Sequence, residues 1–115
     1  MPAEAPTRHV LDRLVTRRTI VVVAALHESG AMRFSELERH IGAMSQKVLT
    51  QTLRALERDG IVDRRVSATV PVAVHYSLTP LGDGLADAMG AVREWASANL
   101  DAIHAARDEY ASQHP

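Results

Sequence analysis

Side chains able to form paired hydrogen bonds gather in a polar stretch that follows Gly42. The set comprises Ser45, Gln46, Lys47, Thr50, Gln51 and Arg54. Gln and Arg can each bond two atoms of a purine edge in the major groove, and the first turn of a helix, where a Lys lies here, is favourable for phosphate. We interpret this stretch as a candidate DNA-contacting face.

The other side of the same stretch is apolar. Leu49, Leu53 and Leu56 recur at i, i+4 and i+7, which is the spacing of an amphipathic helix. Ser45 suits an N-cap and Gly60 suits the end of the helix. We therefore predict a helix from Ser45 to Asp59 with its leucines packed inward. Most polar helical faces are merely solvated. The interpretation of this face as a DNA-contacting face therefore depends on the neighbouring elements.

A second short helix is predicted directly before this one. Phe34, Leu37 and Ile41 lie at helical spacing, and Gly42 is placed to end the helix. Two short helices separated by residues 42–44 allow the second helix to stand clear of the domain and enter a major groove. The order of these elements predicts a helix-turn-helix.

A β-hairpin is predicted immediately after the second helix. Its strands are Ile61–Val66 and Val72–Leu78, and Ser67–Pro71 forms the tip. Three arginines outside the helix suit contacts to the DNA backbone, although one of the adjacent pair could point to the far side of the sheet. They are Arg33, Arg64 and Arg65.

Helices are also predicted at both ends of the domain. Residues 1–8 are expected to form a flexible tail, and residues 9–115 the folded domain, whose first element is a short helix over Val10–Val15. The apolar run Thr19–Glu28 fits a buried strand or a buried helix, and we favour the helix because Gly30 can end it.

The last predicted helix begins with a strong start signal. Thr79 suits the N-cap and Pro80 the first helical position. Apolar residues then recur to about Ala111, with Asn99 expected to weaken the helix locally. The predicted fold is therefore mainly α with a small β-hairpin, which is a winged helix-turn-helix.

Composition limits the other classes of function. The chain has 115 residues, which fits one domain, and it has no cysteine, which excludes disulfides and thiolate zinc sites. No apolar run is long enough to cross a membrane and the start does not resemble a signal peptide, so we expect a cytoplasmic protein. The net charge of −1 means that any DNA binding must come from local charge.

Enzymatic and metal-binding interpretations have little support in the sequence. There is no nucleophile elbow, P-loop or glycine-rich phosphate cradle, so we expect no catalysis and no cofactor. The six histidines are scattered. Asp101, His104 and Asp108 share one helical face, but this spacing is more typical of a solvated face than of a metal site.

Several motifs together resemble those of the HxlR-type winged-helix regulators, over roughly Leu11 to Leu100. They are Arg33–Leu37, Ser45–Thr50, Leu53–Gly60, Pro71 with His75–Thr79, Gly82 with Leu85, and Trp95. The resemblance implies a homodimer that binds pseudo-palindromic duplex DNA, with Ser67–Pro71 as the wing. It also implies pairing through the first and last helices. The residues expected at that dimer interface are Leu11, Leu14, Met89, Val92, Trp95, Leu100 and Ile103.

The chain departs from the family pattern at three points. It lacks the N-terminal cysteine that senses oxidants or electrophiles in many members, so a thiol switch cannot be transferred to it. A tryptophan common near Arg18–Thr19 is also missing. Ala73 stands where a basic wing residue is usual, which leaves more of the phosphate grip to Arg64 and Arg65.

Two alternatives stay open at this point. A winged helix can bind a protein instead of DNA, and the near-neutral net charge is compatible with that role. A regulator of the same fold can also respond to an unidentified small-molecule effector, provided that a pocket forms between the last helix and the DNA-binding core.

Overall fold

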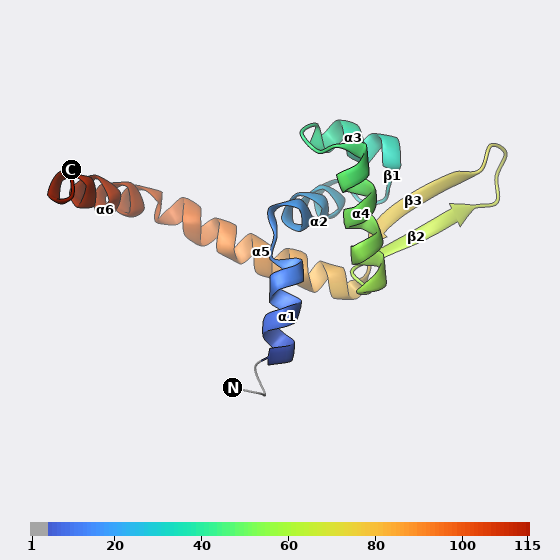
Figure 1. Cartoon of the computed structure of the whole chain (residues 1–115). Coiled ribbons are helices and arrows are strands. Elements are labelled where there is room, and N and C mark those ends of the chain that lie inside the picture. The colour runs from blue at the N-terminus through green and yellow to red at the C-terminus, as the bar shows by residue number, and fades with distance from the viewer. Residues whose placement is uncertain (1–4) are drawn as a thin grey trace.

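The computed structural model describes residues 5–115, which form six helices and a three-stranded antiparallel sheet (Figure 1). The elements are α1 (Ala5–Leu14), α2 (Arg17–Ser29), β1 (Met32–Arg33), α3 (Phe34–Ile41), α4 (Gln46–Arg58), β2 (Val62–Ser67), β3 (Ala73–Leu78), α5 (Pro80–Ala98) and α6 (Leu100–Gln113). The predicted fold class, a winged helix-turn-helix built mainly of helices, is confirmed.

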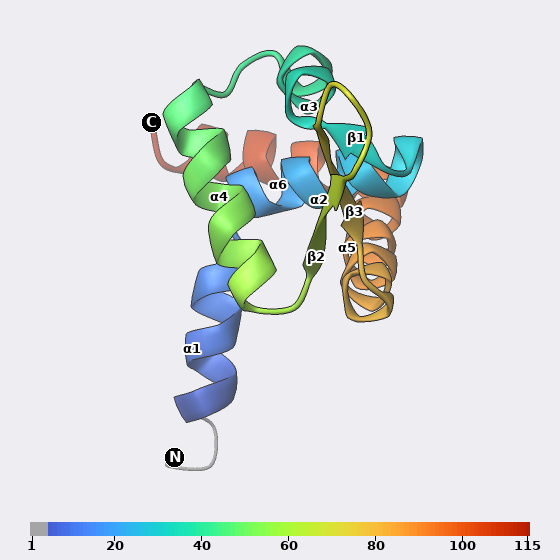
Figure 2. The same cartoon turned by 90° about the vertical axis from the view of Figure 1, so that its right-hand side faces the viewer.

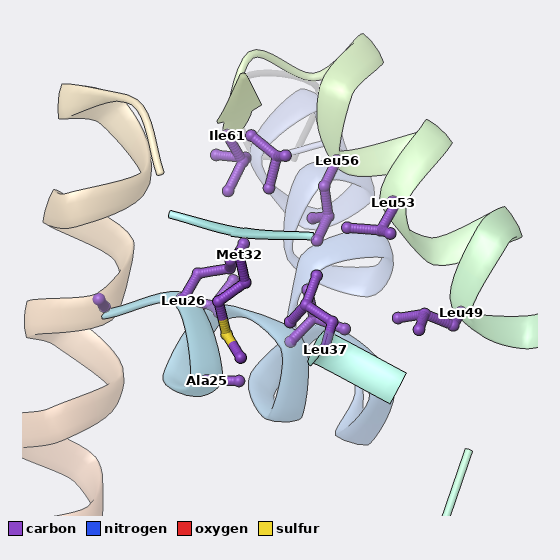
Figure 3. Close-up of a cluster of buried hydrophobic side chains, with 12 residues drawn as sticks. Ala25, Leu26, Met32, Leu37, Leu49, Leu53, Leu56 and Ile61 are labelled. Atoms are coloured by element: carbon purple, nitrogen blue, oxygen red, sulfur yellow. The ribbon is translucent and has the colours of Figure 1, made fainter. Parts of the chain in front are cut away.

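The core lies between α2, α3, α4 and the sheet. Leu49, Leu53 and Leu56 are 0%, 2% and 1% exposed, and Figure 3 shows them reaching from α4 toward Leu37 and the rest of the buried cluster. Full burial of a leucine contributes about 1.5–3 kcal/mol. The leucine spacing therefore identified the inward face of α4 correctly.

The apolar run after Thr16 is a helix and not a strand. The Thr16 Oγ1 accepts a hydrogen bond from the backbone N–H of Thr19 at 3.2 Å, which caps α2. Val22, Val23 and Leu26 are buried. Gly30 ends the helix with a φ of 76°, a left-handed conformation that favours glycine.

The sheet has one strand that the sequence did not predict. Its order is β1-β3-β2, and β1 pairs Met32 with Tyr76 and Arg33 with His75. A two-residue strand is too short to show an alternating pattern. The hairpin itself is confirmed, although its strands begin at Val62 and Ala73, one residue later than predicted.

The start of α5 is fixed against the end of α4. The Thr79 Oγ1 accepts the N–H of Gly82 at 3.1 Å and donates to the carbonyl of Gly60 at 2.6 Å. Gly82 is buried because the backbone carbonyl of Ile61 occupies the space that a Cβ would need. The predicted N-cap at Thr79 is present.

Two helical segments project from the compact part, α1 at one end of the chain and α5–α6 at the other (Figures 1 and 2). The long last helix of the prediction is two helices, because Asn99 leaves the helical path and its Nδ2 donates to the carbonyl of Trp95 at 2.8 Å. At the other end, α1 begins at Ala5, within the expected tail. Residues 1–4 lie outside the described part of the chain.

Candidate nucleic-acid interface

The exposed face of α4 carries most of the predicted contact residues. The Ser45 Oγ accepts the N–H of Val48 at 3.2 Å, which confirms it as the N-cap. Gln46, Lys47, Gln51 and Arg54 are exposed. Their side-chain donors and acceptors point away from the leucine core and are available to a ligand.

Thr50 lies on this face with one of its hydrogen-bonding functions already used. Its Oγ1 donates to the backbone carbonyl of Gln46 at 2.9 Å, and the residue is half-buried. The hydroxyl oxygen keeps its capacity to accept a bond. Thr50 therefore offers an acceptor to a ligand but no donor in this rotamer.

Contacts of α3 and the conformation of Gly42 position the turn between α3 and α4. Leu37 of α3 is fully buried. The Arg33 backbone N–H donates to Glu36 Oε1 at 3.0 Å, which satisfies a donor at the start of α3. Gly42 turns the chain with a φ of 75°. These contacts fix the N-terminal end of α4, where Gln46 and Lys47 lie.

One flank of α4 faces the hairpin across a groove of about 300 Å³. Thr50 and Arg54 line it from α4, and Arg64 and Tyr76 line it from the sheet. Arg64 pairs with Tyr76, which pairs with the buried Met32, and directly opposed residues share one face of a sheet. Arg64 thus lies on the helix-facing side, close to the exposed face of α4.

The other two predicted arginines lie on the opposite face of the sheet. Arg33 and Arg65 both pair with His75, so the three share a face that excludes Arg64. The Arg65 Nε donates to Asp63 Oδ2 at 2.7 Å, and this hydrogen bond raises the pKa of Arg65 by favouring the charged form. The expectation that Arg64 and Arg65 point to different sides is confirmed.

Charge is strongly segregated along the chain. Residues 5–79 contain eleven Lys or Arg and seven Asp or Glu, a formal charge of +4. Residues 80–115 contain two and six respectively, a formal charge of −4. The net charge conceals this division, which was visible in the sequence and which sequence reasoning missed. Because of this division, the near-neutral net charge of the whole chain is no longer an argument for a protein-binding role.

The basic residues around α4 are not neutralised by neighbouring carboxylates. Within residues 5–115, no Asp or Glu oxygen lies within 4.0 Å of the side-chain nitrogens of Lys47, Arg54 or Arg64. Their charge is available to an anionic ligand. The exposed face of α4 is therefore a polar and cationic surface on a rigid support.

Comparison with known proteins decides the family. The family model described as HxlR-like helix-turn-helix matches residues 14–104. The chain belongs to the HxlR-like family. Its relatives include the uncharacterized HTH-type transcriptional regulator YtfH of Escherichia coli K12, which is 42% identical over 109 residues, 95% of this chain and 86% of the relative.

Solved structures of similar regulators share the fold. A structure described as the transcriptional regulator YtfH from Salmonella typhimurium is 41% identical, covers 90% of this chain and 91% of its own, and superposes with a TM-score of 0.75. The reduced form of the redox regulator HypR is 34% identical, with coverages of 88% and 99% and a TM-score of 0.76. The present chain is accordingly a helix-turn-helix transcriptional regulator.

The wing of this HxlR-like chain has no basic residue at its tip. Residues 66–74 contain no charged side chain, and Val66, Val70 and Val72 are exposed. Ala73, which stands where the family pattern usually has a basic residue, is buried. The basic residues of the hairpin, Arg64 and Arg65, therefore lie away from its tip.

The residues predicted for a dimer interface divide into two groups. Leu11, Val92, Trp95 and Leu100 are exposed large apolar side chains. Leu14, Met89 and Ile103 are half-buried, and the first two of these pack against the core of the same chain. The first group forms apolar surface on the projecting helices.

A groove of about 460 Å³ lies between α2 and α5, at the position expected for an effector pocket. His27 and Glu28 line it from α2, and Asp87 and Met89 line it from α5. The effector itself stays a prediction.

Within the described residues, no helix is long and apolar enough to span a bilayer.

Proposed function

We propose that this chain acts as a homodimer that binds a pseudo-palindromic operator in duplex DNA. In this proposal α4 enters the major groove and the hairpin over residues 61–78 lies beside it as the wing. The contact residues are Arg33, Ser45, Gln46, Lys47, Thr50, Gln51, Arg54, Arg64 and Arg65.

The observation that carries the proposal is the two-sided character of α4. Leu49, Leu53 and Leu56 anchor one face in the core, while Gln46 and Arg54 are exposed on the helix. A recognition helix needs this arrangement, because base edges are read by side chains held on a rigid support.

Charge supports the same orientation of the molecule on DNA. Phosphate contacts supply much of the affinity of such proteins, and the basic excess lies in residues 5–79 with α4 and the hairpin. The acidic α5–α6 segment would be repelled by the duplex. We therefore place DNA against α4 and Arg64, with α5–α6 turned away.

The exposed apolar residues of α1, α5 and α6 support the homodimer. Trp95 is 61% exposed and Val92 is 68% exposed, and large apolar residues grouped on a surface are typical of interaction sites. Pairing through these helices would present two copies of α4 to one face of DNA. Recognition of successive major grooves requires them to lie about 34 Å apart.

Fluorescence anisotropy with an operator fragment selected from the source genome and with random DNA tests the proposal. Arg54→Ala and Gln46→Ala should reduce the ratio of specific to random affinity by about 10- to 100-fold, because each paired contact to a base contributes about 1–3 kcal/mol. Lys47→Ala and Arg64→Ala should weaken both affinities about equally.

The control is Arg107→Ala, which removes one exposed charge from α6. It should leave both affinities unchanged or slightly stronger. The proposal is wrong if all four α4 and hairpin variants bind both DNAs as the unmodified protein does. Charge reversal on α4 without any effect on DNA binding would favour the protein-binding alternative.

A further inference from the structure

Two adjacent arginines, Arg17 and Arg18, open α2 at a position unfavourable for positive charge. They are the first two residues of the helix, and the first turn holds no acidic residue. The N-terminal end of a helix dipole is positive, so cations there destabilise the helix. Both side chains are exposed, and neither is within 4.0 Å of a carboxylate of the described residues. Folding does not account for this pair.

The two arginines line a groove that runs along the start of α4. The groove has a volume of about 610 Å³, and Ser45 and Val48 line its α4 side. Arg17 and Arg18 are the charged residues that line it within the described part of the chain. The groove is therefore electropositive and directly continuous with the proposed DNA-contacting face.

This groove lies on the flank of α4 that faces away from the hairpin. Thr50 and Arg54 line the hairpin-side groove with Arg64. Ser45 and Val48 line the α2-side groove, and Gln51 lines a neighbouring hollow together with Arg18. In Figure 1 the hairpin and α2 lie on different sides of α4. Cationic side chains thus bracket α4.

The hollow next to this groove is less suited to an anion. It contains Asp12 and Asp59, of which Asp59 forms an ion pair with Arg13 at 3.6 Å. Among residues 5–115, no acidic residue lines the groove between α2 and α4. The groove beside Arg17 and the start of α4 is therefore better suited to an anion than this hollow.

We propose that Arg17 and Arg18 bind backbone phosphates of the DNA strand on the side of α4 opposite to Arg64. A helix in the major groove lies between two phosphate backbones, and Arg64 is placed for only one of them. This inference rests on the proposed function, because the strand is positioned by α4. Arg17 and Arg18 fix the register of the helix in the groove without reading sequence.

The test is the salt dependence of operator affinity for three double variants of the full chain. Arg17→Ala/Arg18→Ala removes the pair. Arg17→Lys/Arg18→Lys keeps the charge, and Arg93→Ala/Arg107→Ala removes two charges from α5 and α6 as the matched control. Anisotropy titrations at several salt concentrations give the slope of log affinity against log salt, and ethylation interference identifies the phosphates that each variant contacts.

The alanine pair should weaken operator and random DNA alike, by roughly 10- to 100-fold per protomer near 0.1 M salt, and reduce the slope by about 0.9 per lost contact. Ethylation sensitivity should disappear from the strand across α4 from Arg64. The lysine pair should retain most of the affinity, and the control pair should keep the slope of the unmodified protein. The melting temperature of the alanine pair should hold or rise, because the unfavourable dipole interaction is removed.

An unchanged slope and an unchanged ethylation pattern in the alanine pair would overturn this inference while leaving the proposed function intact. Failure of the proposed function gives a different result, because the unmodified protein would then show no operator preference and no dependence on Arg54. A fall in melting temperature with an unchanged slope would assign the two arginines a structural role and also overturn the inference.

Discussion

Two parts of the chain differ in the burial of their apolar side chains. They are the winged-helix part, residues 17–79, and the arm, residues 90–113. The winged-helix part buries a cluster of large aliphatic residues, including Leu37, Leu49 and Leu53. The arm has no buried residue, yet it carries Val92, Trp95 and Leu100. The first part is complete as a single chain, and the arm gains burial only against another surface.

The formal charge also differs in sign between these two parts of the chain. The N-terminal segment with α4 is positive and the α5–α6 segment is negative. A positive surface suits DNA and a negative one avoids it. The comparison separates a packed part that carries the basic residues of α4 from an arm whose large apolar side chains are exposed, and substitutions in each should have separable effects.

The largest effect on stability is expected in the core of the winged-helix part. Leu53→Ala leaves a cavity at a residue that is 2% exposed, so unfolding free energy should fall by about 2–5 kcal/mol. Urea denaturation followed by circular dichroism measures this loss. Leu100→Ala in the arm is the matched control, and an equal loss in that variant would contradict the contrast between the two parts.

The arm should respond in assembly and not in folding. Trp95→Ala removes a large exposed aromatic, and interface tryptophans often contribute about 2 kcal/mol or more. The dimer dissociation constant should therefore rise about 30-fold or more in sedimentation equilibrium. The far-ultraviolet circular dichroism spectrum at high concentration should stay the same. A Trp95→Ala protein that dimerises as tightly as the unmodified protein would remove Trp95 from the interface.

The junction between the two parts should be sensitive to a single methyl group. Gly82→Ala places a Cβ against the backbone carbonyl of Ile61, and such overpacking typically costs about 1–3 kcal/mol. We expect a lower melting temperature in calorimetry. Gly84→Ala is the control, because its Cβ would meet no atom within 4 Å, and it should stabilise the helix slightly. Equal destabilisation by both would argue against the close packing at Gly82.

The smallest effect is expected on the far face of the sheet. Arg65 is bonded to Asp63 at the surface, and exposed ion pairs contribute little to stability. Arg65→Ala should leave the melting temperature unchanged and weaken DNA less than Arg64→Ala does. A larger DNA effect from Arg65 than from Arg64 would show that the hairpin meets DNA with its other face.

Local signals were sufficient for the elements that position the site. The leucine period, the cap at Ser45 and the Thr79-Pro80 start each act within a few residues, and the structure has all three. The break at Asn99 was expected only as a weakening, because a single polar residue does not show whether a helix bends or ends.

Features that depend on tertiary contacts were not predictable in the same way. β1 is formed by two residues and exists through pairing with β3. Arg17 and Arg18 are about thirty residues from α4 in sequence, and only the packing of α2 brings them beside Ser45. The charge division was present in the sequence, but its meaning depends on knowing that α4 and the arm are spatially separate.

Methylation interference at guanine N7 tests the central claim most directly, since this atom is exposed only in the major groove. The claim is that the exposed face of α4 reads base edges. We predict that N7 methylation blocks binding at two sets of guanines about 10 base pairs apart, and that Arg54→Ala loses this sensitivity at one guanine in each set. Operator binding that is indifferent to N7 methylation, and is the same in the Arg54→Ala protein, would contradict the account.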